Sequence, residues 1–452
     1  MKDLPHGGWS FTSPASRERE SVTKSREGEG PFPVGRGSPQ PRATASHFPS
    51  PVGRRGCRSI CLCFVIQPAE LAMNFAFSDE QELLRRTVRD FARSEVAPFA
   101  REWDREERFP KEVVPKLAAM GLLGIRIPEE YGGSAMDTTS YALTVEEIAK
   151  VDGSLALTVA SHNGLGTGHI LAFGSEAQKR RYLTKAATGE WLAAWALTEP
   201  GSGSDAASMA TTARRDGDHW VLNGTKMFIT QGSVGGFCVV LARSNPNASK
   251  QRGITAFVVE HGTDGFTASN HLLKLGCRSS DTAELKFENV RVADSARLGE
   301  VDHGFIDTLK ILDRGRISIA AMALGLGRGA LDMAIAYAKE RSQFGRAIAE
   351  FQAIQWMLAD SRTELDAAAL LTYRAAALAD AGALFSKEAA MAKLFASEAA
   401  TRVCNRALQI HGGYGYTREF AVERHLRDAK LCEIGEGTSE VQRMVIAKHL
   451  LQ

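Results

Sequence analysis

The chain has 452 residues, a length that suggests two or three domains, or one large folding unit built of several layers. Its share of hydrophobic residues is 44% and its share of charged residues is 24%, which are ordinary values for a globular protein. A net charge of +2 without a Lys/Arg-rich block argues against nucleic acid as a partner.

The cysteines favour reduced intracellular thiols over a disulfide framework. Four of the seven are scattered singly, namely Cys238, Cys277, Cys404 and Cys432. Cys57, Cys61 and Cys63 form a cluster, but no Cys/His set lies near them at zinc spacing, so we predict no metal site. No apolar run approaches the roughly 18 residues of a membrane span, and we therefore expect a soluble protein without one.

Residues 1–72 differ in composition from the rest of the chain. They hold nine of the 15 prolines and eight glycines, and they show no helical or strand periodicity. Such a segment buries too little apolar surface to offset chain entropy, so we expect disorder. Its ten basic and six acidic residues suggest a targeting peptide, but its glutamates and prolines argue against a transit helix. We interpret it as a disordered or non-native extension of a cytoplasmic, bacterial-type protein that starts at Met73. The alternative is a genuine transit peptide and the mitochondrial matrix.

Residues 73–193 are predicted to be helical. Ser78 and Gln81 form a capping-box pattern, which precedes apolar residues at helical spacing, namely Leu83, Leu84, Val88 and Phe91. Helical texture continues in residues 111–123, 140–152 and 176–189, with a loop at 127–134. We therefore expect an N-terminal helical domain.

The predicted secondary structure changes twice after this segment. Residues 194–300 hold short β-branched or aromatic runs at 219–230, 237–244, 253–260 and 282–292, separated by Asn-Gly and other turn signals. Residues 301–452 hold Ala/Leu-rich stretches at 314–344, 351–382 and 386–413, each long enough for a bundle helix. The expected order is a helical domain, an antiparallel sheet or barrel, and a helical bundle.

Two glycine-rich strings do not indicate a nucleotide-binding unit of the Rossmann type. "GLGTG" at 164–168 and "GLGRG" at 325–329 lack the G-x-G-x-x-G spacing and follow no predicted strand. We interpret both as places where backbones approach closely within or beside helices.

A third glycine-containing segment, "CEIGEGTSEVQ" at 432–442, places Glu436 between two glycines. The glycines remove side chains that would crowd a ligand, so Glu436 could face a pocket as a general base. Glu-Gly-Thr-Ser is also an ordinary turn composition, which a solvated loop carboxylate would share.

Two long motifs decide between these alternatives. "WALTEPGSGSDAASMATTA" at 195–213 supplies hydroxyls and free backbone N–H groups where the helical segment joins the first strands. With "QIHGGYGYTREFAVERHLRDAK" at 409–430 and the opening "EGTSEVQ" at 436–442, it resembles the paired motifs of the acyl-CoA dehydrogenase family of flavoproteins. The resemblance covers essentially all of residues 73–452, and the order of helical and strand-rich segments also fits.

The resemblance implies an α+β fold with an N-terminal helical domain, a central antiparallel β-barrel and a C-terminal four-helix bundle. It also implies FAD, commonly in a homotetramer that is a dimer of dimers. Along the flavin it places Trp195, Leu197, Thr198, Ser204, Phe228 and Thr230. The family often has tryptophan where Phe228 stands, so an aromatic face is kept and an indole N–H is lost.

The resemblance places a second group of cofactor contacts at a neighbouring subunit. Arg341 and Phe344 of "RSQFG" would contact the pyrophosphate and adenine there, with help from Gln352. Gln409, Gly412 and Gly413 would complete that contact, and Thr438 and Glu440 would touch adenosine. FAD would then be bound only by the assembled oligomer.

The substrate contacts implied by the resemblance lie mainly in "LDRGR". This stretch holds Asp313, Arg314 and Arg316, and we place it at the head of the first bundle helix. Arg316 would orient the catalytic loop or contact the CoA portion. Ser204 and Gly437 would also touch the thioester.

The implied reaction is the α,β-dehydrogenation of an acyl-CoA to a trans-2-enoyl-CoA, in fatty acid or amino acid catabolism. Glu436 would remove the α-proton and its backbone N–H would help a flavin ribityl hydroxyl hold the carbonyl oxygen, while hydride leaves for flavin N5. Some family members carry the base just before the arginine matched by Arg316, but Gly315 stands there, so Glu436 has no competitor. Apolar surroundings would raise the pKa of Glu436 toward neutrality.

The sequence also suggests a substrate class, an electron acceptor and two alternative functions. We expect short or branched-short acyl chains, with electron-transferring flavoprotein as the acceptor. One alternative is an acyl-CoA oxidase, and another is a flavin-bearing DNA-binding relative with little dehydrogenase activity. Nitroalkane oxidation would call for aspartate in place of Glu436.

Overall fold

The computed structural model describes residues 76–452 except residue 270. The segment predicted to be disordered, residues 1–72, therefore lies outside the described residues, and so does the cluster of Cys57, Cys61 and Cys63. The four scattered cysteines are free and buried, as expected for reduced thiols.

The N-terminal part of the described chain is helical, as predicted. Its α-helices are α1 (Asp79–Phe91), α2 (Ala100–Glu106), α3 (Val114–Ala119), α4 (Thr138–Ala149), α5 (Gly153–Ser161), α6 (Thr167–Phe173), α7 (Glu176–Gln178) and α8 (Thr184–Ala187). The predicted capping box is present, because Ser78 and Gln81 exchange hydrogen bonds at the start of α1. Leu83, however, is 60% exposed, since only Leu84, Val88 and Phe91 share the face that packs on the core.

A central sheet follows. Its strands are β1 (Ala193–Ala196), β2 (Thr212–Asp216), β3 (His219–Thr230), β4 (Phe237–Arg243), β5 (Ile254–Glu260), β6 (Phe266–Ala268), β7 (Thr282–Ala293) and β8 (Arg297–Leu298). The strand order is β6-β7-β3-β2-β4-β5-β8, with β1 paired to β4. Most pairings are antiparallel, but β1 and β2 both pair with β4 in parallel.

The Asn-Gly pair at 223–224 is not the turn that the sequence suggests. Both residues lie inside β3, where the pairing with β7 shifts register between Leu222 and Gly224. Gly224 has φ of 151°, and a Cβ there would overlap Thr211. The glycine is therefore needed for a bulge and close packing, which outweigh the turn preference of the dipeptide.

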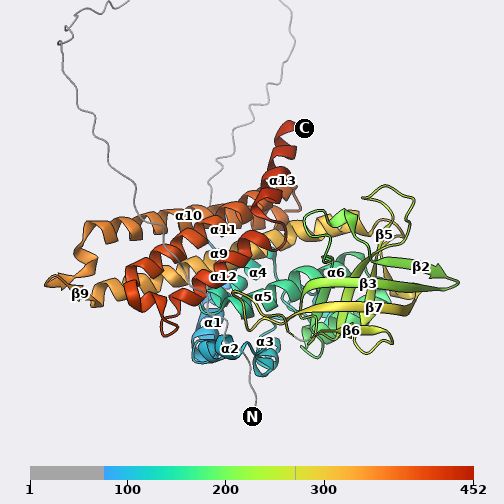
Figure 1. Cartoon of the computed structure of the whole chain (residues 1–452), viewed down its shortest axis with the longest axis horizontal. Helices are drawn as coiled ribbons and strands as arrows, with labels where there is room; N and C mark the ends of the chain where they lie inside the picture. The colour runs from blue at the N-terminus through green and yellow to red at the C-terminus, as the bar shows by residue number, and fades with distance from the viewer. Residues whose placement is uncertain (1–75, 270) are drawn as a thin grey trace, which may run out of the picture. The chain divides into compact units, whose positions relative to one another are not determined.

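The C-terminal part is a helical bundle with a small hairpin at one end. It consists of α9 (Gly304–Glu340), β9 (Ser342–Gln343), β10 (Arg346–Ala347), α10 (Gln352–Asp380), α11 (Ser386–His411), α12 (Val422–Ile434) and α13 (Ser439–Leu451). Figure 1 shows α9, α10 and α11 running side by side, with β9 at the end of these helices opposite to the sheet. The expected fold class is thus confirmed.

Helix α9 forms the centre of the bundle. It contacts α4 and α5 on one side and α10, α11 and α12 on the others, and glycines of "GLGRG" allow these contacts. A Cβ at Gly325 or Gly329 would overlap a carbonyl oxygen of Glu146 or Lys150, so the prediction of close backbone approach is confirmed. By length and composition alone α9 could cross a membrane, but 72% of its apolar window is buried inside the protein.

Successive residues of β4 alternate between two hydrophobic cores, one on each face of the sheet. Phe237, Val239 and Leu241 of β4 pack toward α6 and α8, whereas the residues between them pack into a second core on the opposite face. Both faces of β4 are covered, which explains why its sequence reads as a continuous apolar run.

Candidate active site

Glu436 lies in the four-residue connection, residues 435–438, between α12 and α13. Helix α12 ends at Ile434, and α13 begins at Ser439 after Thr438, whose side chain accepts a hydrogen bond from the Val441 N–H. Glu436 has φ of 54°, in the left-handed region that a residue with a side chain adopts only at a cost. The surrounding contacts must therefore hold this conformation.

Two fully buried side chains hold this connection. Lys393 of α11 donates from Nζ to the carbonyl oxygen of Gly437 at 2.6 Å. Gln442 of α13 donates from Nε2 to the carbonyl oxygens of Glu436 at 3.3 Å and Gly437 at 2.9 Å. The sequence analysis missed both residues, because a lysine or glutamine inside a helix carries no signal of burial.

The carboxylate of Glu436 packs against α9 where that helix has no side chain. A Cβ at Gly315 would overlap Oε2 of Glu436 and would contact Leu165. Oε2 is buried and has no hydrogen-bond partner among the described residues. Burial raises the pKa of Glu436 to about 7, although the charges of Lys393 and Arg316 oppose the rise. At neutral pH the group is thus poised to take up a proton.

Arg316 is buried beside this carboxylate. Its Nη1 donates to Oδ1 of Asp313 at 2.5 Å, and the hydroxyl of Ser386 donates to the same oxygen at 2.9 Å. The prediction that "LDRGR" lies at the head of the helix is wrong, because α9 begins at Gly304 and Asp313 lies more than two turns inside it. Asp313 thus neutralises Arg316 and does not cap the helix.

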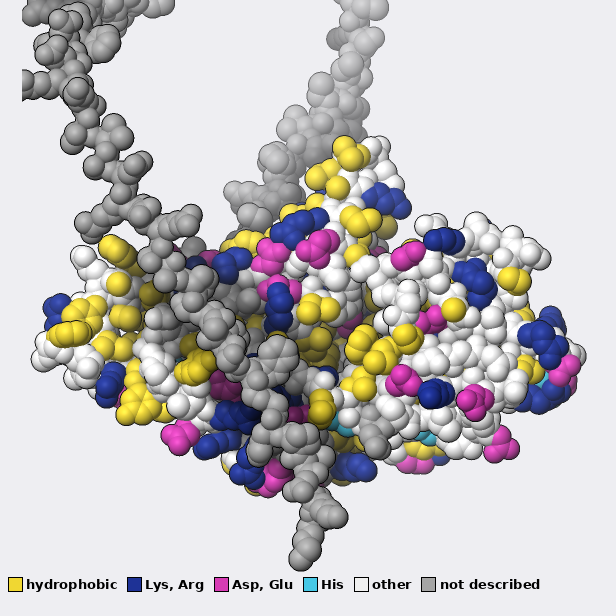
Figure 2. Space-filling view, viewed as in Figure 1, with side chains coloured by type: hydrophobic (Ala, Val, Ile, Leu, Met, Phe, Trp, Pro, Cys, Tyr) yellow, Lys and Arg dark blue, Asp and Glu magenta, His cyan; other side chains and the backbone are white. Residues whose placement is uncertain are grey.

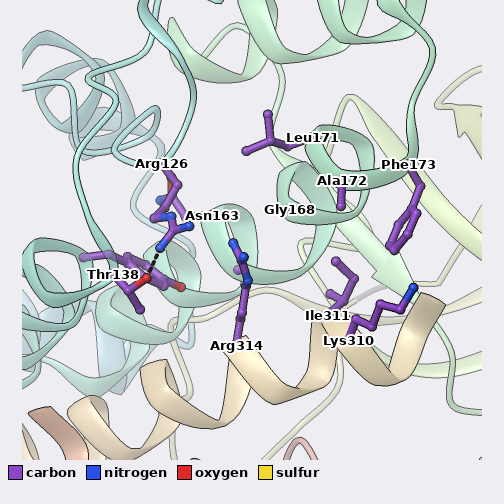
Figure 3. A pocket seen from close by; sticks show the side chains of 12 residues that line it. Arg126, Thr138, Asn163, Gly168, Leu171, Ala172, Phe173, Lys310, Ile311 and Arg314 are labelled. Atoms are coloured by element: carbon purple, nitrogen blue, oxygen red, sulfur yellow. Dashed lines mark hydrogen bonds between the residues drawn. The ribbon is translucent and has the colours of Figure 1, made fainter. Parts of the chain in front are cut away.

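A cavity of about 350 Å³ is lined by α4, α6, α9 and the π-helical turn at 162–166, and its lining includes Arg314, which directly precedes Gly315. Figure 3 shows its lining side chains, which include Arg126, Thr138, Asn163, Leu171, Phe173, Lys310, Ile311 and Arg314. Of the predicted substrate residues, Arg314 lines this cavity and Arg316 does not. Tyr141 and Gly164 line it too, and the Tyr141 hydroxyl would contact a Cβ at Gly164.

The predicted flavin segment follows β1. Trp195 and Leu197 are buried, and the Trp195 indole donates to Nδ1 of His169 at 3.2 Å. Thr198 is half-buried, and its carbonyl oxygen accepts from the Met227 N–H of β3 at 2.8 Å. The two ends of the predicted flavin contacts, Thr198 and Phe228 to Thr230, therefore lie on neighbouring backbones.

A buried ion pair fixes the same segment. Lys226 Nζ donates to Glu199 Oε1 at 2.8 Å and to the carbonyl oxygen of Leu197 at 3.0 Å. Glu199 also accepts from the N–H groups of Ala210 at 2.5 Å and Thr211 at 2.9 Å. These contacts close the loop that carries the exposed Ser204, and no sequence pattern predicted them.

Phe228 has the features of a ligand-contacting aromatic residue. It is 63% exposed and has φ of 60°, which is unusual for a bulky side chain. Thr230 lies half-buried at the end of the same strand. An exposed ring beside the Thr198 segment fits a planar, partly apolar ligand such as a flavin.

The remaining predicted cofactor residues lie elsewhere. Arg341, Gly412 and Gly413 line a concavity of about 460 Å³ with Tyr414, over whose ring the Arg341 guanidinium lies at 5.6 Å. Phe344 is 94% exposed at the β9–β10 turn. Gln352 and Gln409 are exposed on α10 and α11, and Thr438 and Glu440 flank the start of α13.

Within one chain, the predicted FAD contacts thus lie in separate parts of the fold. The hairpin that carries Phe344 lies at the end of the bundle opposite to the sheet with Phe228 (Figure 1). The site would be continuous only if another copy supplied the missing part.

The chain matches family models for the three parts of one enzyme fold. Residues 78–190 match the acyl-CoA dehydrogenase N-terminal domain, residues 194–290 the middle domain and residues 302–451 the C-terminal domain. It is 50% identical over 380 residues to the probable acyl-CoA dehydrogenase YngJ of Bacillus subtilis, covering 84% of this chain and 100% of that protein. It is 45% identical over 375 residues to the short-chain specific acyl-CoA dehydrogenase of Clostridium acetobutylicum, covering 83% of this chain and 99% of that protein.

Solved structures agree. Butyryl-CoA dehydrogenase from Megasphaera elsdenii is similar with a TM-score of 0.82 and 41% identity, covering 84% of this chain and all of that one. A structure described as the electron transferring flavoprotein of Acidaminococcus fermentans has a TM-score of 0.83 and 42% identity over 84% of this chain and all of that one. A glutaryl-CoA dehydrogenase from Mycobacterium smegmatis in complex with FADH2 has a TM-score of 0.79 and 32% identity, covering 83% of this chain and 95% of that one.

The chain therefore belongs to the acyl-CoA dehydrogenase family of flavin-dependent oxidoreductases.

Proposed function

We propose that the protein oxidises an acyl-CoA thioester to the trans-2-enoyl-CoA, with Glu436 as the base that removes the α-proton. The observation that carries this proposal is the buried Oε2 of Glu436, which has no hydrogen-bond partner among the described residues and fills the space that Gly315 leaves on α9. A carboxylate with a pKa of about 7 is matched to proton abstraction at neutral pH.

The cofactor in this proposal is FAD. When bound, FAD supplies the hydride acceptor for the β-carbon. Trp195, Leu197, Thr198, Ser204, Phe228 and Thr230 would hold its ring region, and Phe228 is an exposed aromatic residue with no other evident use. The second group of contacts would come from another copy, through Arg341, Phe344, Gln352, Gln409, Gly412 and Gly413, with Thr438 and Glu440 near adenosine.

This chain's own residues would position the base and the thioester. Lys393 and Gln442 hold the backbone around Glu436, so that its carboxylate stays against Gly315. Arg316, neutralised by Asp313, stays beside the carboxylate, which favours a role in orienting the catalytic loop over a contact with CoA. Arg314, Ser204 and Gly437 would contact the substrate.

The preferred substrates in this proposal are short or branched-short acyl-CoA thioesters. The support is the similarity to relatives named as short-chain specific and butyryl-CoA dehydrogenases. Electron-transferring flavoprotein would take the electrons, the protein would be a homotetramer, and its parts would divide at residues 73–193, 194–300 and 301–452. Its compartment would be the cytoplasm, or the mitochondrial matrix if residues 1–72 act as a transit peptide.

The test is an anaerobic titration of the purified yellow protein with butyryl-, isobutyryl-, isovaleryl-, octanoyl- and palmitoyl-CoA, followed by flavin absorbance. We expect bleaching by the short or branched-short thioesters and reoxidation by electron-transferring flavoprotein. Fast reoxidation by oxygen would instead identify an oxidase. An oxidised spectrum with every thioester would contradict the proposal.

The DNA-binding alternative gains no support from the surface. On the face in Figure 2, outside the grey atoms, Lys and Arg side chains alternate with Asp and Glu and do not form a single basic patch.

A further inference from the structure

The cavity beside the catalytic region is lined by three cationic side chains and by no carboxylate of the described residues. Arg126 comes from the loop before α4, and Lys310 and Arg314 come from α9. Figure 3 shows Arg126 and Arg314 reaching toward one another from opposite walls. Lys310 is compensated, since it pairs with Asp307 at 3.4 Å and lies over the Phe173 ring at 5.4 Å. The two arginines form no ion pair with any described residue.

Arg126 is a partly buried cation without a carboxylate partner. Its guanidinium donates to the Thr138 hydroxyl, and among the described residues it forms no ion pair. Asp137 and Asp380 act on it electrostatically, but their oxygens accept hydrogen bonds from the backbone at the start of α4. Arg314, which is exposed to the cavity, likewise has no ion pair in the described part of the chain.

Burial and the charge of Arg314 both lower the pKa of Arg126. Two guanidinium groups that face each other across a cavity repel, and a partly buried one also lacks its full hydration. An anion between them would remove both costs, because guanidinium groups bind carboxylates and phosphates in a forked geometry. The arrangement is therefore that of an anion site.

This site adjoins the catalytic carboxylate. Thr138, the partner of Arg126, lies one turn before Tyr141 on α4, and the charge of Glu436 acts on Tyr141. Arg314 directly precedes Gly315, against which Glu436 packs. A molecule whose α-carbon faces Glu436 would thus have another part within reach of the two arginines.

We propose that Arg126 and Arg314 together bind an anionic group of the thioester substrate, a carboxylate or a phosphate. This inference rests on the proposed function for the identity of the ligand. The anion has two sources, namely a carboxylate at the far end of the acyl chain and a phosphate of the CoA portion. A terminal carboxylate would make dicarboxylic acyl-CoA thioesters a substrate class of this protein.

The experiment compares three thioesters on the holoenzyme. Glutaryl-CoA carries an acyl carboxylate, butyryl-CoA has none, and S-butyryl-pantetheine lacks the CoA phosphates. The variants are Arg126→Met and Arg314→Met, with Arg126→Lys as the charge-preserving variant. Arg101→Met, at an exposed arginine of α2, is the matched control. Kd and kcat/KM are measured for each, and melting temperatures show that the variants are folded.

Loss of a charge-assisted pair weakens binding by about tenfold to a hundredfold. If the anion is the acyl carboxylate, Arg126→Met and Arg314→Met lower affinity for glutaryl-CoA by that factor more than they lower affinity for butyryl-CoA. If it is a CoA phosphate, both CoA esters weaken equally and S-butyryl-pantetheine does not. Arg126→Lys recovers part of the loss in either case. The proposal would be overturned if the ratios of Kd and of kcat/KM among the three thioesters were the same in Arg126→Met and Arg314→Met as in the wild type.

The anion site can be tested separately from the proposed function, because binding of the anion can be measured without turnover. If no thioester bleaches the flavin, the same variants are titrated by calorimetry with CoA and with glutarate, which requires no turnover. The anion site is supported if Arg126→Met loses the binding heat of CoA or of glutarate and Arg101→Met keeps it. Equal binding by the wild type and both arginine variants contradicts it.

Discussion

Glu436 combines three features that rarely occur in a loop carboxylate. Its backbone is in the left-handed region, its Oε2 is buried with no partner in the part of the chain that the structure describes, and burial raises its pKa to about 7. A solvated turn residue can share the left-handed backbone, but it would have neither the buried oxygen nor the raised pKa. The buried oxygen and the raised pKa favour a general-base role for Glu436 over that of an ordinary turn residue.

Replacing Glu436 by glutamine removes the base but keeps the shape of the side chain. We expect Glu436→Gln to retain FAD and to lose about a hundredfold to ten-thousandfold in turnover, the usual contribution of a general base. Steady-state kinetics together with the flavin spectrum of the purified variant test this. Turnover within a few-fold of the wild type would show that another group takes the proton.

Lys393 acts on the same carboxylate through its charge, and its Nζ donates a hydrogen bond to the carbonyl oxygen of the neighbouring Gly437. Its positive charge lowers the pKa of Glu436, so Lys393→Met should raise that pKa further. Because the base must be deprotonated, the acid limb of the kcat/KM profile should move to higher pH. Rates measured between pH 5 and 9 report the shift.

Gln442→Leu is the matched control for Lys393→Met. It removes hydrogen bonds to the same connection without removing a charge, so it should lower the rate but leave the acid limb in place. An identical acid limb in wild type and Lys393→Met would show that Lys393 has only a structural role.

At the scale of elements, α9 carries glycines with different functions. Alanine is ordinarily better than glycine in a helix by about 1 kcal/mol. At Gly315 the added methyl group would displace the flexible end of Glu436, whereas at Gly325 it would meet the backbone of α4. Gly315 makes room for the Glu436 carboxylate, and Gly325 lets two helices approach.

We therefore expect opposite effects from two alanine substitutions in α9. Gly315→Ala should keep or slightly raise the melting temperature and lower kcat, because only the carboxylate has to move. Gly325→Ala should lower the free energy of unfolding by about 1–3 kcal/mol, the usual cost of overpacking. Thermal melts and turnover of both variants test this pair, and a full loss of folding in Gly315→Ala would contradict the first expectation.

At the scale of the whole molecule, the predicted FAD contacts are divided between the sheet region and the opposite end of the bundle. Phe344 at the β9–β10 turn is almost fully exposed, and Arg341 lies beside a concavity with Gly412 and Gly413. Large exposed aromatic residues at such a place are typical of an interface. This distribution is the structural reason to expect an oligomer with shared cofactor sites.

Arg341→Ala should weaken FAD retention while leaving Glu436 and its surroundings unchanged. We expect wild-type protein to have the mass of four chains by light scattering and to keep one FAD per chain through gel filtration. The variant should lose flavin and regain activity when FAD is added in excess. A monomer that keeps stoichiometric FAD would contradict the shared site.

The sequence by itself determined the family and the order of the three parts, and it singled out Glu436 as the candidate base. Long motifs, capping patterns and periodicity are local features, so they can be read without the tertiary structure. The Asn-Gly pair and the start of α9 were misjudged because packing overrides local preference. For Gly224 the deciding contact is with Thr211, and for Asp313 it is the pair with Arg316.

Only the tertiary structure decided how Glu436 is supported and what faces the cavity. Lys393, Lys226 and Glu199 have ordinary sequence surroundings, and their roles arise from partners far along the chain. Gln442 bonds to the nearby carbonyl oxygens of Glu436 and Gly437, but only the fold shows that its side chain is buried there. The same holds for Arg126 and Arg314, which are 188 positions apart in the printed sequence yet line one cavity. Burial and the meeting of distant charges depend on how helices and strands pack, and no local pattern encodes them.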